Sequence, residues 1–258
     1  LMRPLPPSAL PPHVATALWR GDAMGRASTP VMASGHPPLD AVLPDGGWPR
    51  QSLTEILQAQ PGLGEWRLLG PALARLIELG GSVLLIGPPL VPYLPALAQA
   101  GLLPERLIRI EARTPSERLW ATEQSLKADC LSAVLSWLPQ ARPEQIRRLH
   151  ACAAHHRGLL FTFRPHRVRQ ESSAAPLRLQ LDVGPCPHPL TIQVLKRKGP
   201  LLETPIVLET WARGLAPLWT PPTRPAPARP QRDPRPIRAP DSLVSHADLD
   251  RLAARPLL

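Results

Sequence analysis

The stretch from Glu55 to Leu69, EILQAQPGLGEWRLL, has the pattern of a strand, a turn containing glycine and proline, and the start of a helix. A phosphate-binding loop has this layout because the backbone N–H groups at a helix N-terminus hold the phosphate. Nucleotide hydrolysis also needs a Lys for the β- and γ-phosphates and a Ser or Thr for magnesium. Here Glu65 and Trp66 follow Gly64, and an acidic side chain at this point would repel phosphate.

Two other places for nucleotide chemistry also lack the side chains that it needs. The strand predicted at 131–136 runs into AVLSWLP without the acidic residue of a magnesium–water site, and the strand at 82–86 runs into GPPL without a general-base carboxylate. We therefore expect no enzymatic activity and no cofactor. The degenerate phosphate loop, which we interpret as a tight strand-to-helix turn, consists of Gly62, Gly64, Glu65 and Trp66.

The cluster HACAAHH offers His150, Cys152, His155 and His156 as metal ligands. On a helix, His150 and Cys152 point about 200° apart, since successive residues turn by about 100°. Structural zinc takes four ligands, and no second pair of ligands stands nearby. We interpret the cluster as a partly exposed helix face and predict no metal site. The chain also lacks the Gly-x-Ser-x-Gly elbow of a serine hydrolase.

Basic residues form the strongest binding signal. FRPHRVRQ follows a predicted strand, at the sheet edge where α/β proteins carry their binding loops, and LKRKGP adds a second basic turn. Such loops grip nucleic-acid phosphates without reading bases. A solvated basic edge and an acidic protein partner remain equally open interpretations. The candidate residues for nucleic-acid or partner binding are Arg147, Arg148, Arg164, Arg167, Arg169, Lys196, Arg197, Lys198, Arg224, Arg229, Arg232, Arg235 and Arg238.

Composition sets the remaining limits on function. The 258 residues carry 30 Lys and Arg against 20 Asp and Glu, and the net charge of +10 favours a polyanion or an acidic protein surface as partner. A hydrophobic share of 43% is enough for a packed core. The three cysteines have no CxxC spacing, which favours a reducing, cytoplasmic compartment. No apolar run approaches the ~20 residues of a membrane span.

Strand-like and helix-like segments alternate through the middle of the chain. The expected strands are 53–57, 82–86, 107–110, 131–136 and 159–163, and the expected helices are about 65–79, 92–100, 115–128 and 143–156. Nearly continuous apolar strands that alternate with helices predict an α/β fold, with a mostly parallel sheet covered on both faces. Beyond residue 175, PLRLQLDV and LTIQVLKRK alternate with period two and TPIVLE follows, and we interpret these segments as antiparallel strands that extend the sheet.

One helix start is marked especially clearly. In TPSE, Thr114 can cap the helix, Pro115 fits the first helical position and Glu117 completes a capping box.

Prolines gather at both ends of the chain and set its expected organisation. Residues 217–240, PLWTPPTRPAPARPQRDPRPIRAP, cannot form a helix or a central strand, so we expect disordered, proline-rich tails. We divide the chain into an N-terminal segment (1–30), a globular domain (31–215), a Pro/Arg-rich linker (216–240) and a short helical peptide (241–258).

With these segments in order, residues 31–210 resemble the RecA-like recombinase core and, within it, the SOS-mutagenesis family ImuA. The resemblance lies in SGHPPLDAVLPDGGWPRQSLTEIL before the loop, PGLGEWRLLGPAL at the loop, RIEARTPSERLWATEQSLKADCLSAVLSWLP and GLLFTFRP in the core, and LDVGPCPHPLTIQVLKRKGP at its close. In the loop, a recombinase would have its phosphate-binding Lys-Thr.

The resemblance implies a non-catalytic accessory protein of error-prone translesion DNA synthesis. Its partners would be ImuB, an inactive relative of Y-family polymerases, and an error-prone replicative-type DNA polymerase, with RecA and DNA as further candidates. The alternatives are a DNA-binding RecA-like ATPase with an atypical nucleotide site and an SOS cell-division inhibitor.

Overall fold

The computed structural model describes residues 30–184, 189–200 and 202–210, so both predicted tails lie outside the described residues. Within them, one sheet of eight strands has the order β10-β9-β8-β3-β7-β6-β4-β5. The strands are β3 (Leu53–Gln58), β4 (Val83–Ile86), β5 (Leu107–Ile110), β6 (Ala133–Trp137), β7 (Leu159–Pro165), β8 (Leu177–Val183), β9 (Leu190–Lys196) and β10 (Ile206–Leu208). The predicted α/β class with a mostly parallel sheet is confirmed.

In this sheet the strands from β3 to β8 run parallel to one another, and the two antiparallel pairings are β8 with β9 and β9 with β10. The prediction for 177–183 was therefore wrong in part, because β8 is parallel to β3 and antiparallel only to β9. Alternation with period two reports that one face of a strand is buried, but it carries no information about the direction of the strand. The antiparallel prediction for β9 and β10 is confirmed.

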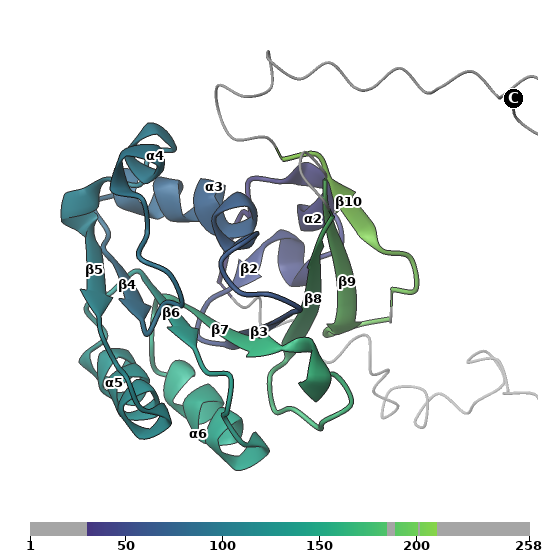
Figure 1. Ribbon diagram of the computed structural model, residues 1–258. Helices are drawn as coiled ribbons and strands as arrows, with labels where there is room; N and C mark the ends of the chain where they lie inside the picture. The colour runs from purple at the N-terminus through teal and green to yellow at the C-terminus, as the bar shows by residue number, and fades with distance from the viewer. Residues whose placement is uncertain (1–29, 185–188, 201, 211–258) are drawn as a thin grey trace, which may run out of the picture. The chain divides into compact units, whose positions relative to one another are not determined.

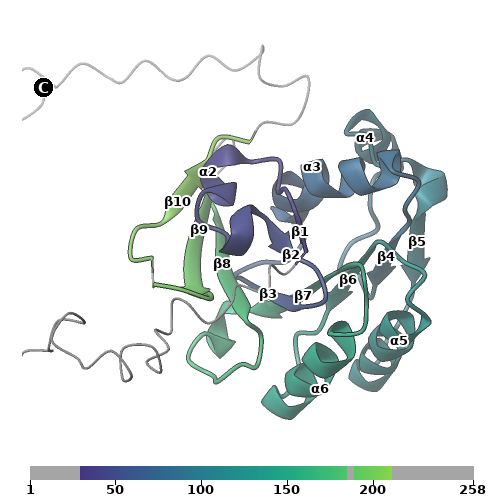
Figure 2. The ribbon, with the colours of Figure 1, turned by 180° about the vertical axis from the view of Figure 1, so that it is seen from behind.

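Helices cover both faces of the sheet (Figures 1 and 2). One face carries α3 (Glu65–Glu78) and α4 (Leu94–Gln99), and the other carries α5 (Pro115–Ala128) and α6 (Pro143–Ala153). Each face has its own apolar cluster: Leu68 and Leu73 of α3 pack in the first, and Leu126 of α5 and Ile146 of α6 pack in the second. All four helices match the predictions to within a few residues at their ends.

A small antiparallel sheet of β1 (Val31–Met32) and β2 (Trp48–Pro49) precedes β3, with α2 (Pro37–Asp40) and the short 3-10 helix η2 (Pro44–Gly46) between its strands. Trp48 is fully buried and meets Phe161 of β7 edge to face, with ring centroids 5.2 Å apart. The aromatic pair thereby anchors this small sheet to the main one. Two more 3-10 turns, η3 (Pro104–Arg106) and η4 (His166–Val168), lead into β5 and out of β7.

The capping box predicted for α5 is confirmed. The Glu117 N–H donates to Thr114 Oγ1 at 3.2 Å, and Thr114 N–H donates to Glu117 Oε2 at 3.0 Å. The Arg113 N–H also donates to Glu117 Oε2, at 2.8 Å. The backbone N–H of Thr114, followed by that of Arg113, holds the pKa of Glu117 below its usual value. In the described part of the chain, no helix is both long enough and apolar enough to cross a membrane.

Candidate functional site

The loop between β3 and α3 lies at the carboxyl edge of the central strand, which β7 and β8 flank. Two glycines shape it. Gly62 has φ +90°, a left-handed backbone conformation that residues with a side chain rarely adopt. Gly64 precedes the first residue of α3, and a Cβ added to it would lie 2.9 Å from Val183 Cγ2. The loop therefore brings its backbone N–H groups to the start of α3 against a packed wall of β8.

The Glu65 carboxylate fills the centre of this loop. Gly62 N–H donates to its Oε1 at 2.7 Å, and Gly64 N–H donates to its Oε2 at 3.1 Å. Two side chains from the sheet also donate to Oε1: Gln58 Nε2 at 2.9 Å and Trp137 Nε1 at 3.2 Å. Glu65 is only 2% exposed. A negatively charged group thus sits at a helix N-terminus, where the helix dipole and the free N–H groups stabilise an anion.

The tertiary structure assigns Glu65 a different part from the one expected. From the sequence, Glu65 was expected only to repel phosphate from the turn. In the structure its carboxylate accepts the hydrogen bonds of the backbone N–H groups in that turn. Gly62, Gly64 and Glu65 come together as predicted. Trp66 does not join them, because its half-buried side chain packs against the apolar cluster under α3.

Trp137, the donor from β6, is held on two sides. Its ring stacks on Phe163 of β7 with centroids 4.6 Å apart and an interplanar angle of 20°. Its carbonyl accepts a hydrogen bond from Arg118 Nη1 at 3.1 Å, and Arg118 Nε donates to the Ala112 carbonyl at 3.0 Å. These contacts hold Trp137 in the position from which its Nε1 donates to Glu65.

A second buried carboxylate lies in the middle of β3. Glu55 is fully buried and pairs with Arg164 of β7 and Arg178 of β8, at 2.8 and 2.7 Å. The three side chains bridge three adjacent strands. Because the charge of Glu55 faces two guanidinium groups, its burial is compensated.

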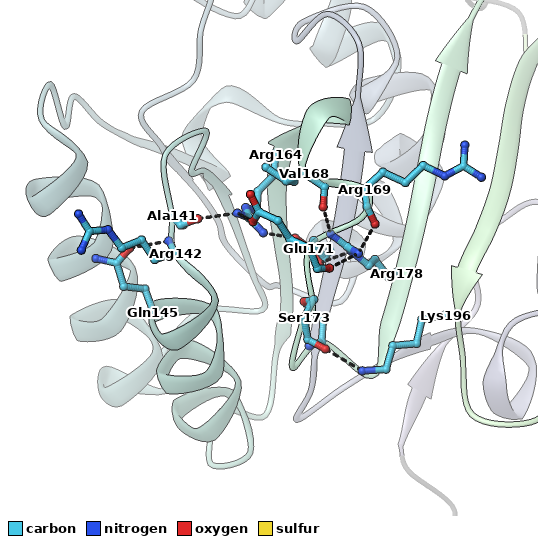
Figure 3. A network of polar contacts seen from close by, with 12 residues as sticks. Ala141, Arg142, Gln145, Arg164, Val168, Arg169, Glu171, Ser173, Arg178 and Lys196 are labelled. Atoms are coloured by element: carbon cyan, nitrogen blue, oxygen red, sulfur yellow. Dashed lines mark hydrogen bonds and ion pairs between the residues drawn. The ribbon is translucent and has the colours of Figure 1, made fainter.

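The two arginines of this triad also shape the loop after β7 (Figure 3). Arg164 Nη2 donates to the Ala141 carbonyl and to Glu171 Oε2, at 2.5 and 2.9 Å. Arg178 donates to the carbonyls of Val168, Arg169 and Glu171. Arg164 was predicted to bind nucleic acid or a partner, but it is 2% exposed and occupied by these contacts. That prediction was wrong because the sequence does not show that a carboxylate of β3 faces this arginine.

Most of the other basic candidates lie on the surface. Arg167 and Arg169 are exposed just after β7, and Figure 3 shows the Arg169 guanidinium pointing away from the polar network. The exposed residues of the predicted set that fall within the described part are Arg147, Arg148, Arg167, Arg169, Lys196 and Lys198, whereas Arg197 is half-buried. The five candidates from Arg224 to Arg238 lie outside the described residues.

Several of these surface residues already have partners in the chain. Arg148 pairs with Glu123, Lys196 donates to the Ser173 carbonyl at 2.8 Å, and Arg197 Nη1 donates to the Val42 carbonyl at 2.5 Å. The hydrogen bond from Lys127, followed by that from Arg148, lowers the pKa of Glu123.

The histidines of HACAAHH are spread over different environments. His156 is buried with its Nδ1 3.2 Å from Asp129 Oδ1, His150 is half-buried, and His155 is exposed. Burial lowers the pKa of His156, and the Asp129 carboxylate opposes that shift. Burial also lowers the pKa of His150, as does the charge of Lys196. In the part of the chain that the structure describes, no three His, Cys, Asp or Glu side chains are grouped to hold a metal ion.

An exposed apolar surface beside the loop escaped the sequence analysis. We call it the apolar rim, and it comprises Leu63, Leu90, Val91, Tyr93 and Leu94. Val91 and Tyr93 are 74% and 73% exposed. The rim adjoins the Glu65 loop, since a Cβ added to Gly62 would lie 2.8 Å from Leu90 Cδ1. The absence of any charged residue between 87 and 101 is the sequence signal that could have revealed it.

A small pocket of about 160 Å³ opens farther along the carboxyl edge of the sheet. Its lining joins the first turn of α5 to the segment after β6 and consists of Arg113, Pro115, Arg118, Leu119, Leu138, Pro139, Gln140 and Ala141.

The chain matches no family model and no curated protein.

Proposed function

We propose that this chain is a non-catalytic adaptor protein of SOS-induced, error-prone translesion DNA synthesis, built on a degenerate RecA-like core. The observation that carries the non-catalytic part is the Glu65 carboxylate, which holds the donors that a nucleotide phosphate would need. The central position of β3, between β7 and β8 with its loop at the carboxyl edge, supports a core derived from a nucleotide-binding protein. The assignment to translesion synthesis rests on the ImuA-like order of segments over residues 31–210.

The main partner is an ImuB-type inactive Y-family polymerase homologue, which joins the chain to an error-prone replicative-type polymerase in the cytoplasm. The apolar rim is the contact surface of the described domain in this proposal. Large apolar side chains that gather on a surface, without charges among them, are typical of protein interaction sites. The tail arginines act as a second, tethering arm that raises the effective concentration of the partner.

Pull-down with an ImuB homologue tests this proposal. The full-length chain is expected to retain the partner, and the double variant Leu90→Ser/Tyr93→Ser is expected to lose most of the retention. Trp120→Ser is the matched control, because Trp120 is 65% exposed but belongs to α5 on the other face of the sheet. Failure of the full-length chain to retain the partner overturns the adaptor function. If a chain ending at Ala216 retains the partner as well as the full-length chain does, the tail takes no part in the interaction.

Calorimetric titration with ATP and magnesium tests the non-catalytic part separately. We expect no saturable binding, because Glu65 occupies the loop and neither a Lys nor a hydroxyl residue stands directly after Gly64. Binding well below millimolar concentration, or turnover that substitutions around Gly62 abolish, would replace the adaptor with an ATPase that has an atypical site.

Direct contact with DNA is a second candidate function, favoured by the exposed side chains of Arg167 and Arg169. Both stand on the loop that the buried Arg178 holds in place through the carbonyls of Val168 and Arg169. Arginine contacts to phosphates release counterions, so the affinity for DNA should fall steeply between low and physiological salt. An affinity that barely changes with salt excludes this mode of binding.

A further inference from the structure

The contacts of Glu65 have the composition of an oxyanion site. Two backbone N–H groups, an amide N–H₂ and an indole N–H converge on one carboxylate from β3, β6 and the loop. None of these donors carries a charge. Successive backbone N–H groups in a turn at a helix N-terminus form an anion-binding concavity, and this one has side-chain donors added from the sheet.

Both side-chain donors are buried, and both come from strands of the sheet rather than from the helix. Gln58 is 4% exposed, and its Nε2 contacts Glu65 while its Oε1 has no partner in the described residues. Trp137 is 5% exposed, and its stacking on Phe163 and its carbonyl bond to Arg118 fix its orientation. A simple strand-to-helix turn does not require two buried side-chain donors that point at its first helical residue from strands of the sheet.

We propose that the β3–α3 loop is a phosphate-type oxyanion site whose ligand is the chain's own Glu65 carboxylate, and that removal of this side chain opens the site to inorganic phosphate. The carboxylate supplies the negative charge and the acceptor oxygens that a phosphate would supply, and it is attached to the first residue of the helix. The loop consequently keeps its ligand-bound conformation without any nucleotide. The inference rests on the same Glu65 contacts as the non-catalytic part of the proposed function and deepens that part, but it does not require the protein partner.

The test compares the thermal unfolding midpoints of the wild type, Glu65→Ala and Glu65→Gln in phosphate and in chloride at equal ionic strength. Both variants should unfold at lower temperature than the wild type in chloride. Phosphate should raise the midpoint of Glu65→Ala with a saturable concentration dependence. The wild type and Glu65→Gln should show only the smaller, non-saturable rise that phosphate causes in proteins generally, because their loops stay filled.

Direct titration of the same three proteins with inorganic phosphate provides the second measurement. Binding to Glu65→Ala and to neither of the others supports the proposal. Equal effects of phosphate on all three proteins indicate an adventitious ion only and overturn it, as does the absence of any specific effect on Glu65→Ala. If Glu65→Ala does not fold in chloride, its refolding yields in phosphate and in chloride are compared, and equal yields overturn the proposal. The experiment uses no partner, so its failure removes the phosphate-like interpretation of the loop and leaves the partner interaction untouched, whereas failure of the pull-down leaves this inference untouched.

Discussion

Two carboxylates are buried in this domain, Glu55 in β3 and Glu65 at the start of α3, and their negative charges are stabilised in different ways. Glu55 faces the guanidinium groups of Arg164 and Arg178 across three strands. Glu65 faces four uncharged donors at the start of a helix. The first arrangement balances the buried charge with two opposite charges, whereas the second stabilises it with two backbone N–H groups and two neutral side-chain donors. The comparison indicates that Glu55 maintains the sheet and that Glu65 maintains the loop.

Replacing Glu55 by Gln should produce the largest effect. Arg178 would then be buried without a counter-charge, and Arg164 would keep only the exposed Glu171 as its carboxylate partner. Breaking a buried pair costs about 3–5 kcal/mol. Urea denaturation should show a loss of this size in the free energy of unfolding. Phosphate should not restore it, in contrast to Glu65→Ala. A loss below about 1 kcal/mol would contradict the structural part assigned to Glu55.

Replacing Arg164 by Met should cost slightly less, about 3 kcal/mol, because Arg178 still pairs with Glu55. The matched control is Arg167→Met, which changes an exposed arginine three residues away and should stay within about 0.5 kcal/mol of the wild type. Measured by the same denaturation, equal effects of the two substitutions would mean that Arg164 does not hold the sheet as described.

The substitution Trp137→Phe tests the neutral donors that surround Glu65. The substitution keeps a ring that can stack on Phe163 but removes the N–H that donates to Glu65. Loss of one hydrogen bond to a charged acceptor should cost about 1.5–3 kcal/mol, at the lower end here because three donors remain. Chemical denaturation gives the value. A cost as large as that of Glu55→Gln would remove the distinction between a set of neutral donors and a specific ion pair.

His156 is a buried base, and its substitution should have the smallest effect on the free energy of unfolding. Because burial lowers its pKa, the folded chain binds fewer protons than the unfolded chain at pH values below the ordinary histidine pKa of about 6.5. The free energy of unfolding should therefore fall as the pH drops below about 6.5, until the folded-state pKa is passed. Unfolding measured between pH 7.5 and 5 should show a shallower dependence in His156→Gln than in the wild type. An unchanged slope would assign the dependence to other groups, such as His150.

The elements of this fold follow closely from local patterns. Apolar runs located the strands from β3 to β7, the TPSE signal located the start of α5, and the glycines of QAQPGLGEW located the turn after β3. These features depend on residues a few positions apart, where periodicity and capping act directly. The predicted tails and their arginines remain predictions, since they lie outside the described residues.

The long-range partners of the site could not be predicted in this way. Trp137 is 72 residues from Glu65, and Arg164 and Arg178 are 109 and 123 residues from Glu55. Which side chains meet depends on the strand order β8-β3-β7-β6 and on the direction of β8, neither of which a local pattern encodes. The sequence by itself determined that the loop lacks the residues for nucleotide chemistry. Only the tertiary structure decided that Glu65 is its ligand, because buried donors from β3 and β6 and two backbone N–H groups must converge to make an acidic residue stable there.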